Sequence, residues 1–311
     1  MNIHPTHPAS EPTWLSLHLR CDGDTDEFLR AAVLDTAEDI VARFSGGTWF
    51  YLRYWEGGPH VRLRLLLPAS AHPVASQAVR DHAASWLVEN DPRYEAPQTY
   101  YDQIAGQLAA REGQDRTVLP WQPHGRIWEE KYEPEVTKYG IGPSLQAYER
   151  HFHDSSALAS QALRRRPGQT QVLSLATALI LTSWMRPDLG PGLQSYDELV
   201  SRWGSSQRLD RRKTPQIRAE LLTILMENAG GGNDPWSRPW QGSLDQLLGT
   251  LIAEGLPPEQ RRNGVDICHH LLCNRLGLTL EQELTVRRNA WAAIAGQTPA
   301  PTTTSDLERV Q

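Results

Sequence analysis

The segment TWFYLRYWEGGPHVRLRLLLP, residues 48–68, decides the fold, because it has the pattern of a β-hairpin. Two apolar runs, residues 49–55 and 60–67, flank a short polar turn at residues 56–59. Runs rich in aromatic and branched residues on either side of a Gly- and Pro-containing turn are typical of paired antiparallel strands. We therefore expect a hairpin here and place the neighbouring elements around it.

Alternation along the second run predicts a strand with one apolar face and one basic face. Arg62 and Arg64 project from the face opposite to the aliphatic residues, which are Val61, Leu63 and Leu65. A guanidinium buried without a partner is costly, and its fixed fork suits a carboxylate or a phosphate. Two interpretations remain open: an anion-binding face, or a solvated sheet face on which both arginines pair with surface acids.

The elements around the hairpin predict an α+β region with an antiparallel sheet. A strand over residues 14–21 and a helix with Thr25 as its N-cap and apolar residues at helical spacing over 29–44 precede the hairpin. A helix over 71–89 and a strand near 94–98 follow it. The order strand, helix, strand, strand, helix is half of a ferredoxin-like, split β-α-β arrangement.

Two further helices are expected within this region, over residues 99–112 and 144–163. From residue 170 onward the pattern is mostly helical, with breaks at Pro and Gly. The helices expected there cover residues 170–185, 193–204, 215–229, 240–254, 258–276 and 279–295. We expect an α+β region over 13–165 and a helical region over 166–296, either as two domains or as one continuous domain over 13–296. The ends, 1–12 and 297–311, have the composition of disordered segments.

The composition indicates a globular cytoplasmic protein. Apolar residues make up 39% of the 311 residues and charged residues 22%, and the net charge of −6 argues against a general nucleic-acid surface. Cys21, Cys268 and Cys273 form neither a CxxC pair nor a disulfide framework, which suits a reducing compartment. The sequence has no signal peptide and no apolar run of membrane-spanning length, so we expect no membrane contact.

Three motifs in order give the chain a family resemblance. WFYLRY at residues 49–54 is followed by GPHVRLR at 58–64, YEPE at 132–135 is followed by KYG at 138–140, and HHLLCNRLG covers 269–277. These motifs resemble those of the C-terminal domain of class I lantibiotic dehydratases. The same domain occurs as free-standing thiopeptide-type bacteriocin biosynthesis proteins.

The resemblance implies a β-elimination. The family domain removes glutamate from glutamylated Ser or Thr side chains of a ribosomally made precursor peptide and leaves dehydroalanine or dehydrobutyrine. Such a site needs a fork for the leaving carboxylate and an acid/base that works near neutral pH. The implied partners are the precursor peptide with its leader and a separate tRNA-dependent glutamylating protein. No cofactor and no metal are implied, and a homodimer is allowed.

The resemblance also assigns site residues. Arg62 and Arg64 are expected to hold the glutamyl carboxylate, and His270 to transfer a proton, since imidazole titrates in the working range. The expected substrate-binding residues are Arg53, His60, Arg126, Glu133, Tyr139, Asn274 and Arg275. The chain departs from the family at Pro134, where many members have an arginine; Arg126 or Lys131 is a candidate replacement.

Other interpretations of the same residues stay open. Taken alone, His270 is compatible with a core histidine, or with a zinc ligand beside Cys268, His269 and Cys273. The YEPE segment also fits a solvated turn before a helix. For the whole chain, the alternatives are a formal [4+2] pyridine-forming cyclase of thiopeptide maturation and a non-catalytic partner that binds a leader peptide along a sheet edge. Such cyclases tend to lose the elimination arginines and histidine.

Overall fold

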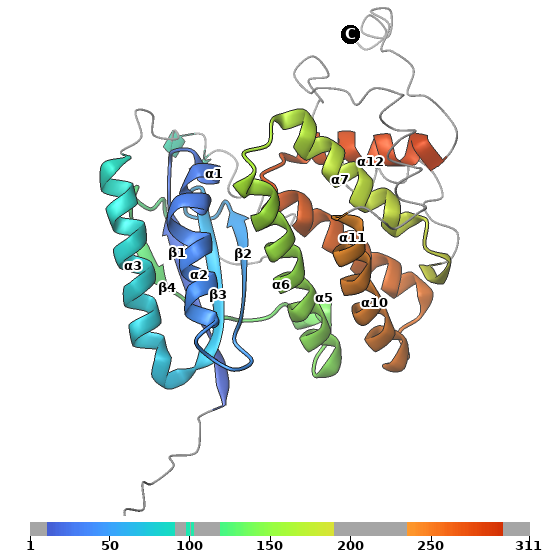
Figure 1. Cartoon of the computed structure of the whole chain (residues 1–311), viewed down its shortest axis with the longest axis horizontal. Coiled ribbons are helices and arrows are strands. Elements are labelled where there is room, and N and C mark those ends of the chain that lie inside the picture. The colour runs from blue at the N-terminus through green and yellow to red at the C-terminus, as the bar shows by residue number, and fades with distance from the viewer. Residues whose placement is uncertain (1–10, 91–97, 100, 103–118, 190–234, 295–311) are drawn as a thin grey trace, which may run out of the picture. The chain divides into compact units, whose positions relative to one another are not determined.

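A computed structural model of the chain describes residues 11–90, 98–99, 101–102, 119–189 and 235–294 (Figure 1). The chain divides after Arg165 into two compact units, and each is described by itself. Several expected segments lie largely or wholly outside the described residues: the strand near 94–98, the helices over 99–112, 193–204 and 215–229, and the two ends. No helix within the described ranges has the length and hydropathy needed to cross a membrane.

The N-terminal unit is built on a four-stranded antiparallel sheet. Its strands are β1 (Pro12–Arg20), β2 (Thr48–Tyr54), β3 (His60–Pro68) and β4 (Ile127–Glu129), in the spatial order β2-β3-β1-β4. Because β3 is antiparallel to both β1 and β2, these two strands run parallel with β3 between them. This is the split β-α-β topology, so the predicted hairpin and ferredoxin-like sheet are confirmed.

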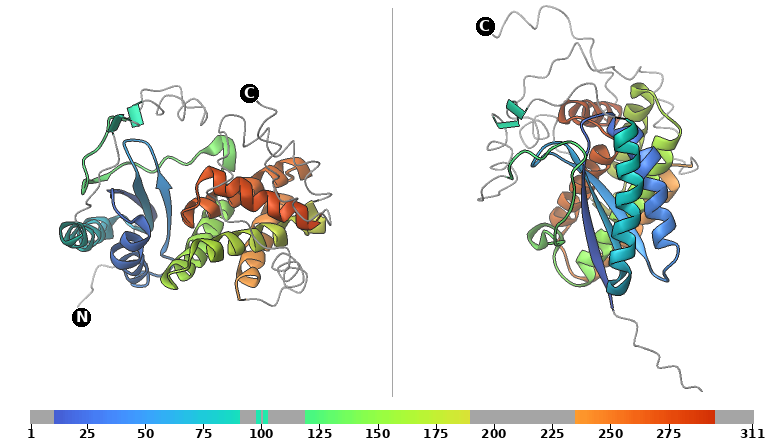
Figure 2. Two further views of the ribbon diagram at one scale, coloured as in Figure 1. Left: turned by 90° about the horizontal axis from the view of Figure 1, so that it is seen from above. Right: turned by 90° about the vertical axis from the view of Figure 1, so that its left-hand side faces the viewer.

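Two helical segments cover one face of this sheet and lie side by side on it (Figures 1 and 2). Their elements are α1 (Thr25–Phe28), the π-helical turn η1 (Leu29–Val33), α2 (Leu34–Val41), the 3₁₀ turn η2 (Ala69–Ala71) and α3 (His72–Glu89). The N-cap of the first segment is Asp24, one residue before the predicted Thr25, because the side chain of Asp24 accepts hydrogen bonds from the backbone N–H groups of Asp26 and Glu27.

The apolar core of the N-terminal unit lies between this helical layer and the sheet. Leu17 and Leu19 on β1, Leu63 and Leu65 on β3, and Tyr51 on β2 are fully buried on the helix-covered face. Burying one large apolar side chain stabilises the fold by about 1.5–3 kcal/mol. The alternation predicted for β3 is therefore confirmed, and it leaves the two arginines of this strand on the opposite face.

The long helix α6 (Pro143–Arg164) packs along β2, which is an edge strand of the sheet. The backbone N–H of Tyr51 donates to the hydroxyl of Ser156 at 3.3 Å, and the rings of Phe152 and Phe50 lie 5.5 Å apart, centroid to centroid. Side chains of α6 thus satisfy part of the edge of β2, and they also reach the face of the sheet that carries the arginines.

The described part of the C-terminal unit is helical, as predicted. Its elements are α7 (Gln169–Trp184), the short 3₁₀ turn η3 (Pro187–Leu189), α10 (Ser237–Ala253), α11 (Pro258–Arg275) and α12 (Leu280–Ile294). α7 packs against α10, α11 and α12, and the indole N–H of Trp240 donates to Ser183 at 2.8 Å. α11 has proline in its first turn, and Gly277 follows it with a φ of +76°, which are ordinary start and stop signals.

Candidate functional site

Arg62 lies in an aromatic and acidic environment on the face of the sheet away from α2 and α3. Its guanidinium carbon is 3.2 Å from the centroid of the Tyr54 ring, and its Nη2 is 3.8 Å from Oε2 of Glu56. The Arg62 side chain is 15% exposed and that of Glu56 is fully buried. The face is therefore not an open, solvated surface on which arginines pair with exposed acids.

Arg64 is the neighbouring cation on the same face. Its guanidinium carbon lies 4.6 Å from the centroid of Tyr132 and 5.4 Å from that of Phe50. Within the described ranges no carboxylate lies at ion-pairing distance from Arg64, and its Nε has no hydrogen-bond partner. Burial and then the charge of Arg62 lower the pKa of Arg64 to about 10, so it stays charged at neutral pH. A largely buried cation in this state favours a bound anion.

Three separate elements bring a carboxyl group next to Arg64. The side chain of Glu149 on α6 accepts hydrogen bonds from Tyr132 and from Trp14. Tyr132 lies in the segment between β4 and α5 (Val136–Tyr139), and Trp14 lies on β1. Burial raises the pKa of Glu149, whereas the two donors and the charge of Arg64 lower it. The effect of burial is the larger, so the pKa of Glu149 lies above its usual value. Burial, and then the nearby Glu149, also raise the pKa of Tyr132 well above its usual range, so the phenol is protonated and donates.

A pair of buried imidazoles lies beside Arg62. His60 Nδ1 donates to the carbonyl oxygen of Gly58 at 2.9 Å, so its Nε2 accepts from His18 Nδ1, 3.1 Å away. On the other side of the pair, His18 Nε2 lies 3.6 Å from Oε2 of Glu130. Burial, together with the neighbouring arginines, lowers the pKa of His18 to about 2 and that of His60 to about 3, so both rings are neutral.

The turn between β2 and β3 is fixed by a buried arginine. Arg20, fully buried, donates to the carbonyl oxygen of Pro59 at 2.9 Å and to that of Gln122 at 3.2 Å. Gly58 has a φ of +99°, and a Cβ added there would lie 2.7 Å from Arg20 Nε. The turn therefore holds His60 in place through the Gly58 carbonyl.

The other candidates from this unit are placed as follows. Arg53 is opposite Val61 in the sheet, so it lies on the helix-covered face and pairs with Asp26 at 2.5 Å. Glu133 is exposed, with its carboxylate 4.0 Å from Lys131. Tyr139 is buried against Tyr148 and Phe152, and Arg126 lies over the ring of Trp128 at 5.6 Å.

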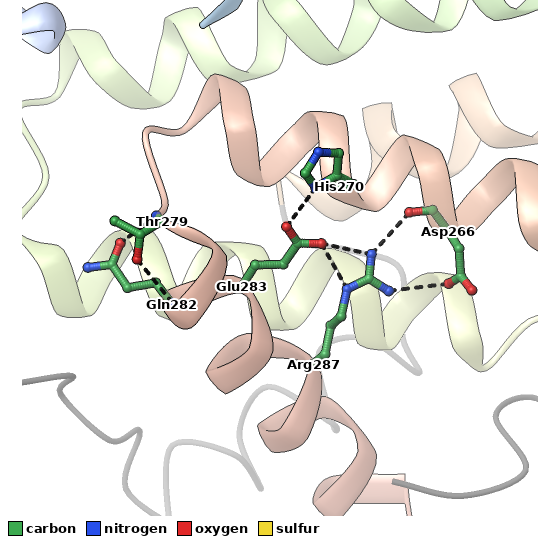
Figure 3. A network of polar contacts seen from close by, with 6 residues as sticks. All are labelled: Asp266, His270, Thr279, Gln282, Glu283 and Arg287. Atoms are coloured by element: carbon green, nitrogen blue, oxygen red, sulfur yellow. Dashed lines mark hydrogen bonds and ion pairs between the residues drawn. The ribbon is translucent and has the colours of Figure 1, made fainter. Parts of the chain in front are cut away.

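In the C-terminal unit, His270 is the first member of a chain of polar contacts (Figure 3). Its Nδ1 is 2.8 Å from Oε2 of Glu283, whose other oxygen accepts from Arg287 Nε at 3.0 Å. Arg287 also contacts Asp266 through the side chain at 3.3 Å and the backbone carbonyl at 3.0 Å. Burial acts to raise the pKa of Glu283, but His270 and Arg287 hold it at about 2, so the carboxylate stays ionised and orients the imidazole.

The remaining residues of this motif lie in the helical core. His269 is fully buried with its ring 6.1 Å from that of Trp184 and 6.2 Å from that of Trp240, and Arg275 is fully buried as well. Asn274 is half-buried. Burial raises the pKa of Cys268 to about 12, and the structure groups no three potential metal ligands in its described part, so the zinc interpretation gains no support.

Sequence reasoning missed several members of both clusters. Their side chains are Trp14, His18, Tyr54, Glu56, Trp128, Glu130, Tyr132 and Glu149 in one unit and Asp266, Glu283 and Arg287 in the other. One signal was available: Glu283 and Arg287 are spaced i, i+4 on a predicted helix, as ion pairs commonly are.

The chain matches a known protein family in sequence and known protein structures in fold. A family model described as lantibiotic biosynthesis dehydratase C-term matches residues 14–294, whereas no curated protein sequence matches the chain. The fold is similar to that of the pyridine synthase TbtD from thiomuracin biosynthesis, with a TM-score of 0.64 and 21% identity over 91% of this chain and 98% of that one.

Two further solved structures share the fold. One is the tRNA dependent lantibiotic dehydratase MibB from Microbispora sp. 107891, with a TM-score of 0.54 and 21% identity over 95% of this chain and 29% of that one. The other is TsrL, with a TM-score of 0.54 and 16% identity over 93% of this chain and 100% of that one. At these identities the likeness concerns the fold alone.

Proposed function

The chain belongs to the family of lantibiotic dehydratase C-terminal domains, and from this premise we propose that it is a glutamate-eliminating enzyme. Its substrate is a ribosomally made precursor peptide whose Ser or Thr side chains carry glutamyl esters. The product is dehydroalanine or dehydrobutyrine together with free glutamate. The proposed partners are this peptide with its leader and a tRNA-dependent protein that installs the glutamate.

The observation that carries the proposal is the state of Arg64. This side chain is charged and largely buried, and within the described ranges no carboxylate pairs with it. A glutamyl ester has one ionised carboxylate before elimination and two after it. Arg62, which is 3.8 Å from Glu56, and Arg64 supply two guanidinium groups on one sheet face for these charges.

The proposed chemistry follows from the balance of the reaction. A base takes the α-proton of the esterified residue, the C–H electron pair forms the Cα=Cβ bond, and the Cβ–O bond breaks. The ester oxygen departs as a carboxylate, whose charge is complete only when this bond is broken. A guanidinium directed at that oxygen therefore stabilises the transition state more than the bound substrate.

An assisting role in proton transfer, at the departing glutamate or at the α-carbon, is assigned to His270. Its Nδ1 contacts the carboxylate of Glu283, which Arg287 binds, and Asp266 in turn binds Arg287, so the ring has a fixed orientation. The side chain is 32% exposed, which allows it to exchange protons with substrate or solvent. An imidazole oriented by a carboxylate is a common acid/base arrangement.

The test is to incubate the purified protein with a glutamylated precursor peptide and to follow the peptide by mass spectrometry. We expect loss of glutamate and formation of the dehydrated peptide. Arg64→Ala should lower kcat/KM roughly 10- to 100-fold, since it removes a hydrogen bond between charged groups worth about 1.5–3 kcal/mol. Arg43→Ala, which removes an exposed arginine of the same unit, is the matched control and should react as the wild type does.

A second candidate function is pyridine formation from two dehydroalanines. It is favoured by the partly exposed aromatic residues beside the arginines, since the rings of Tyr54 and Tyr132 could stack on a heterocycle-bearing peptide. The same assay separates the two candidates. If the protein leaves the glutamylated peptide unchanged, but closes a ring in an already dehydrated peptide and releases its leader, the protein is a cyclase and the proposed elimination is wrong.

A further inference from the structure

Glu149 and Tyr132 have no role in the chemistry described so far, yet they adjoin Arg64. The Tyr132 ring lies under the guanidinium of Arg64 at 4.6 Å, and its hydroxyl hydrogen-bonds to the carboxyl group of Glu149. The indole of Trp14 gives the same carboxyl group a second hydrogen bond, and its ring meets that of Tyr132 edge to face at 5.4 Å. Sheet, connecting segment and helix α6 therefore converge on one carboxyl group beside the anion-binding arginine.

This carboxyl group has the environment of a proton-transfer group rather than of a structural ion pair. Glu149 is only half-buried, and both of its hydrogen-bond donors are neutral. The charged groups facing Glu149 and Tyr132 are Arg64 from β3 and Glu135 before α5, and Tyr139 on α5 faces Arg64. Burial outweighs the donors and raises the pKa of Glu149, which strengthens it as a base near neutral pH.

We propose that Glu149 is the general base that removes the α-proton of the substrate held at Arg64, with Tyr132 and Trp14 as positioning residues that orient its carboxylate. The inference rests on the proposed elimination. In the step itself, one carboxylate oxygen of Glu149 bonds the α-proton, the C–H electron pair becomes the new double bond, and glutamate leaves toward the arginine. The protonated Glu149 then releases its proton to solvent, which restores the enzyme.

The experiment is a pH–rate profile of glutamate elimination for the wild type and three variants. Glu149→Gln should lower kcat at least about 100-fold with little change in KM, because general-base catalysis contributes about 10²–10⁴-fold. Tyr132→Phe removes a donor that stabilises the carboxylate, so the pKa of Glu149 rises and the acidic limb of the profile moves to higher pH. Glu89→Gln, at an exposed position on α3, is the control and keeps the wild-type profile.

The outcomes separate this inference from the proposed function. A wild type that eliminates glutamate, with a Glu149→Gln variant that eliminates it equally fast, overturns the inference and leaves the proposed function standing. A wild type that does not act on the glutamylated peptide overturns both. If Glu149→Gln does not fold, the Tyr132→Phe profile decides: a limb displaced to higher pH supports the inference, and an unmoved limb refutes it.

Discussion

The buried carboxylate of Glu283 gives a quantitative prediction for the C-terminal unit. Burial acts to raise its pKa, yet His270 and Arg287 together lower it from 4.5 to about 2. At about 1.4 kcal/mol per pKa unit, this difference corresponds to about 3 kcal/mol of folding free energy. Glu283→Gln keeps the shape of the side chain but removes the charge, so it should destabilise the unit by about that amount at pH 7.

The pH dependence has a definite sign. Because the pKa of Glu283 is lower in the folded state, the ionised carboxylate contributes its full stabilisation to the folded state above pH 4.5. This stabilisation is lost as the pH falls through about 2. The difference in unfolding free energy between wild type and Glu283→Gln should therefore shrink steadily below pH 4.5. Above that pH it should be constant.

Urea unfolding followed by circular dichroism at several pH values measures this difference, and hydrogen exchange assigns it to α11 and α12. Glu254→Gln, which removes an exposed carboxylate after α10, should change stability by less than about 0.5 kcal/mol. A cost below about 1 kcal/mol at pH 7, or a cost that does not vary with pH, would refute the ionic account of this network.

Three other predictions concern the turn, the imidazole pair and the proton-transfer residue. Gly58→Ala should destabilise the N-terminal unit by more than about 1 kcal/mol in urea unfolding, because φ is +99° and the new Cβ would clash with Arg20. Gly46→Ala is the control: its φ is also positive, but no atom lies within 4 Å of the new Cβ, so it should lower the unfolding free energy by less. Folding lowers the pKa of His18 from 6.5 to about 2 and that of His60 from 6.5 to about 3, mainly by burial. The unfolded state therefore binds more protons, and the free energy of unfolding should drop as the pH falls below 6.5. His18→Gln should reduce the slope of unfolding free energy against pH by about 1.4 kcal/mol per pH unit, and an unchanged slope would show that His18 is not a buried neutral imidazole. His270→Ala should fold and accumulate the glutamyl adduct in the mass assay, whereas normal dehydration by this variant would remove His270 from the reaction.

The hairpin and its two faces could be predicted because alternation is a local property of the chain. The period of two in β3 determines that Val61 and Arg62 point to opposite faces. It does not determine what covers the second face. Tyr132 and Glu149 are far from Arg64 in sequence, and only the tertiary fold brings them together. A solvated arginine face was therefore compatible with the sequence, whereas in the structure aromatic side chains cover this face.

The fourth strand was missed for a related reason. β4 has only three residues, Ile127–Glu129, and lies in a segment of mixed polarity, so it carries no periodic signal of its own. It forms because β1 offers unpaired backbone groups on its free side. The partner of His270 was missed similarly, since Glu283 comes from the next helix and the spacing between helices is set by packing.

The place of β4 in the sheet has a consequence for biosynthesis of the chain. Leu19 on β1 pairs with Ile127, so among the strands of the described ranges one side of β1 has no partner until the ribosome has made residues well beyond the hairpin. A nascent or prematurely terminated chain that ends before Ile127 therefore presents an open sheet edge, which is a template for self-association. Fragments cut before this point should be recovered in the insoluble fraction, and fragments that include β4 and α6 should not.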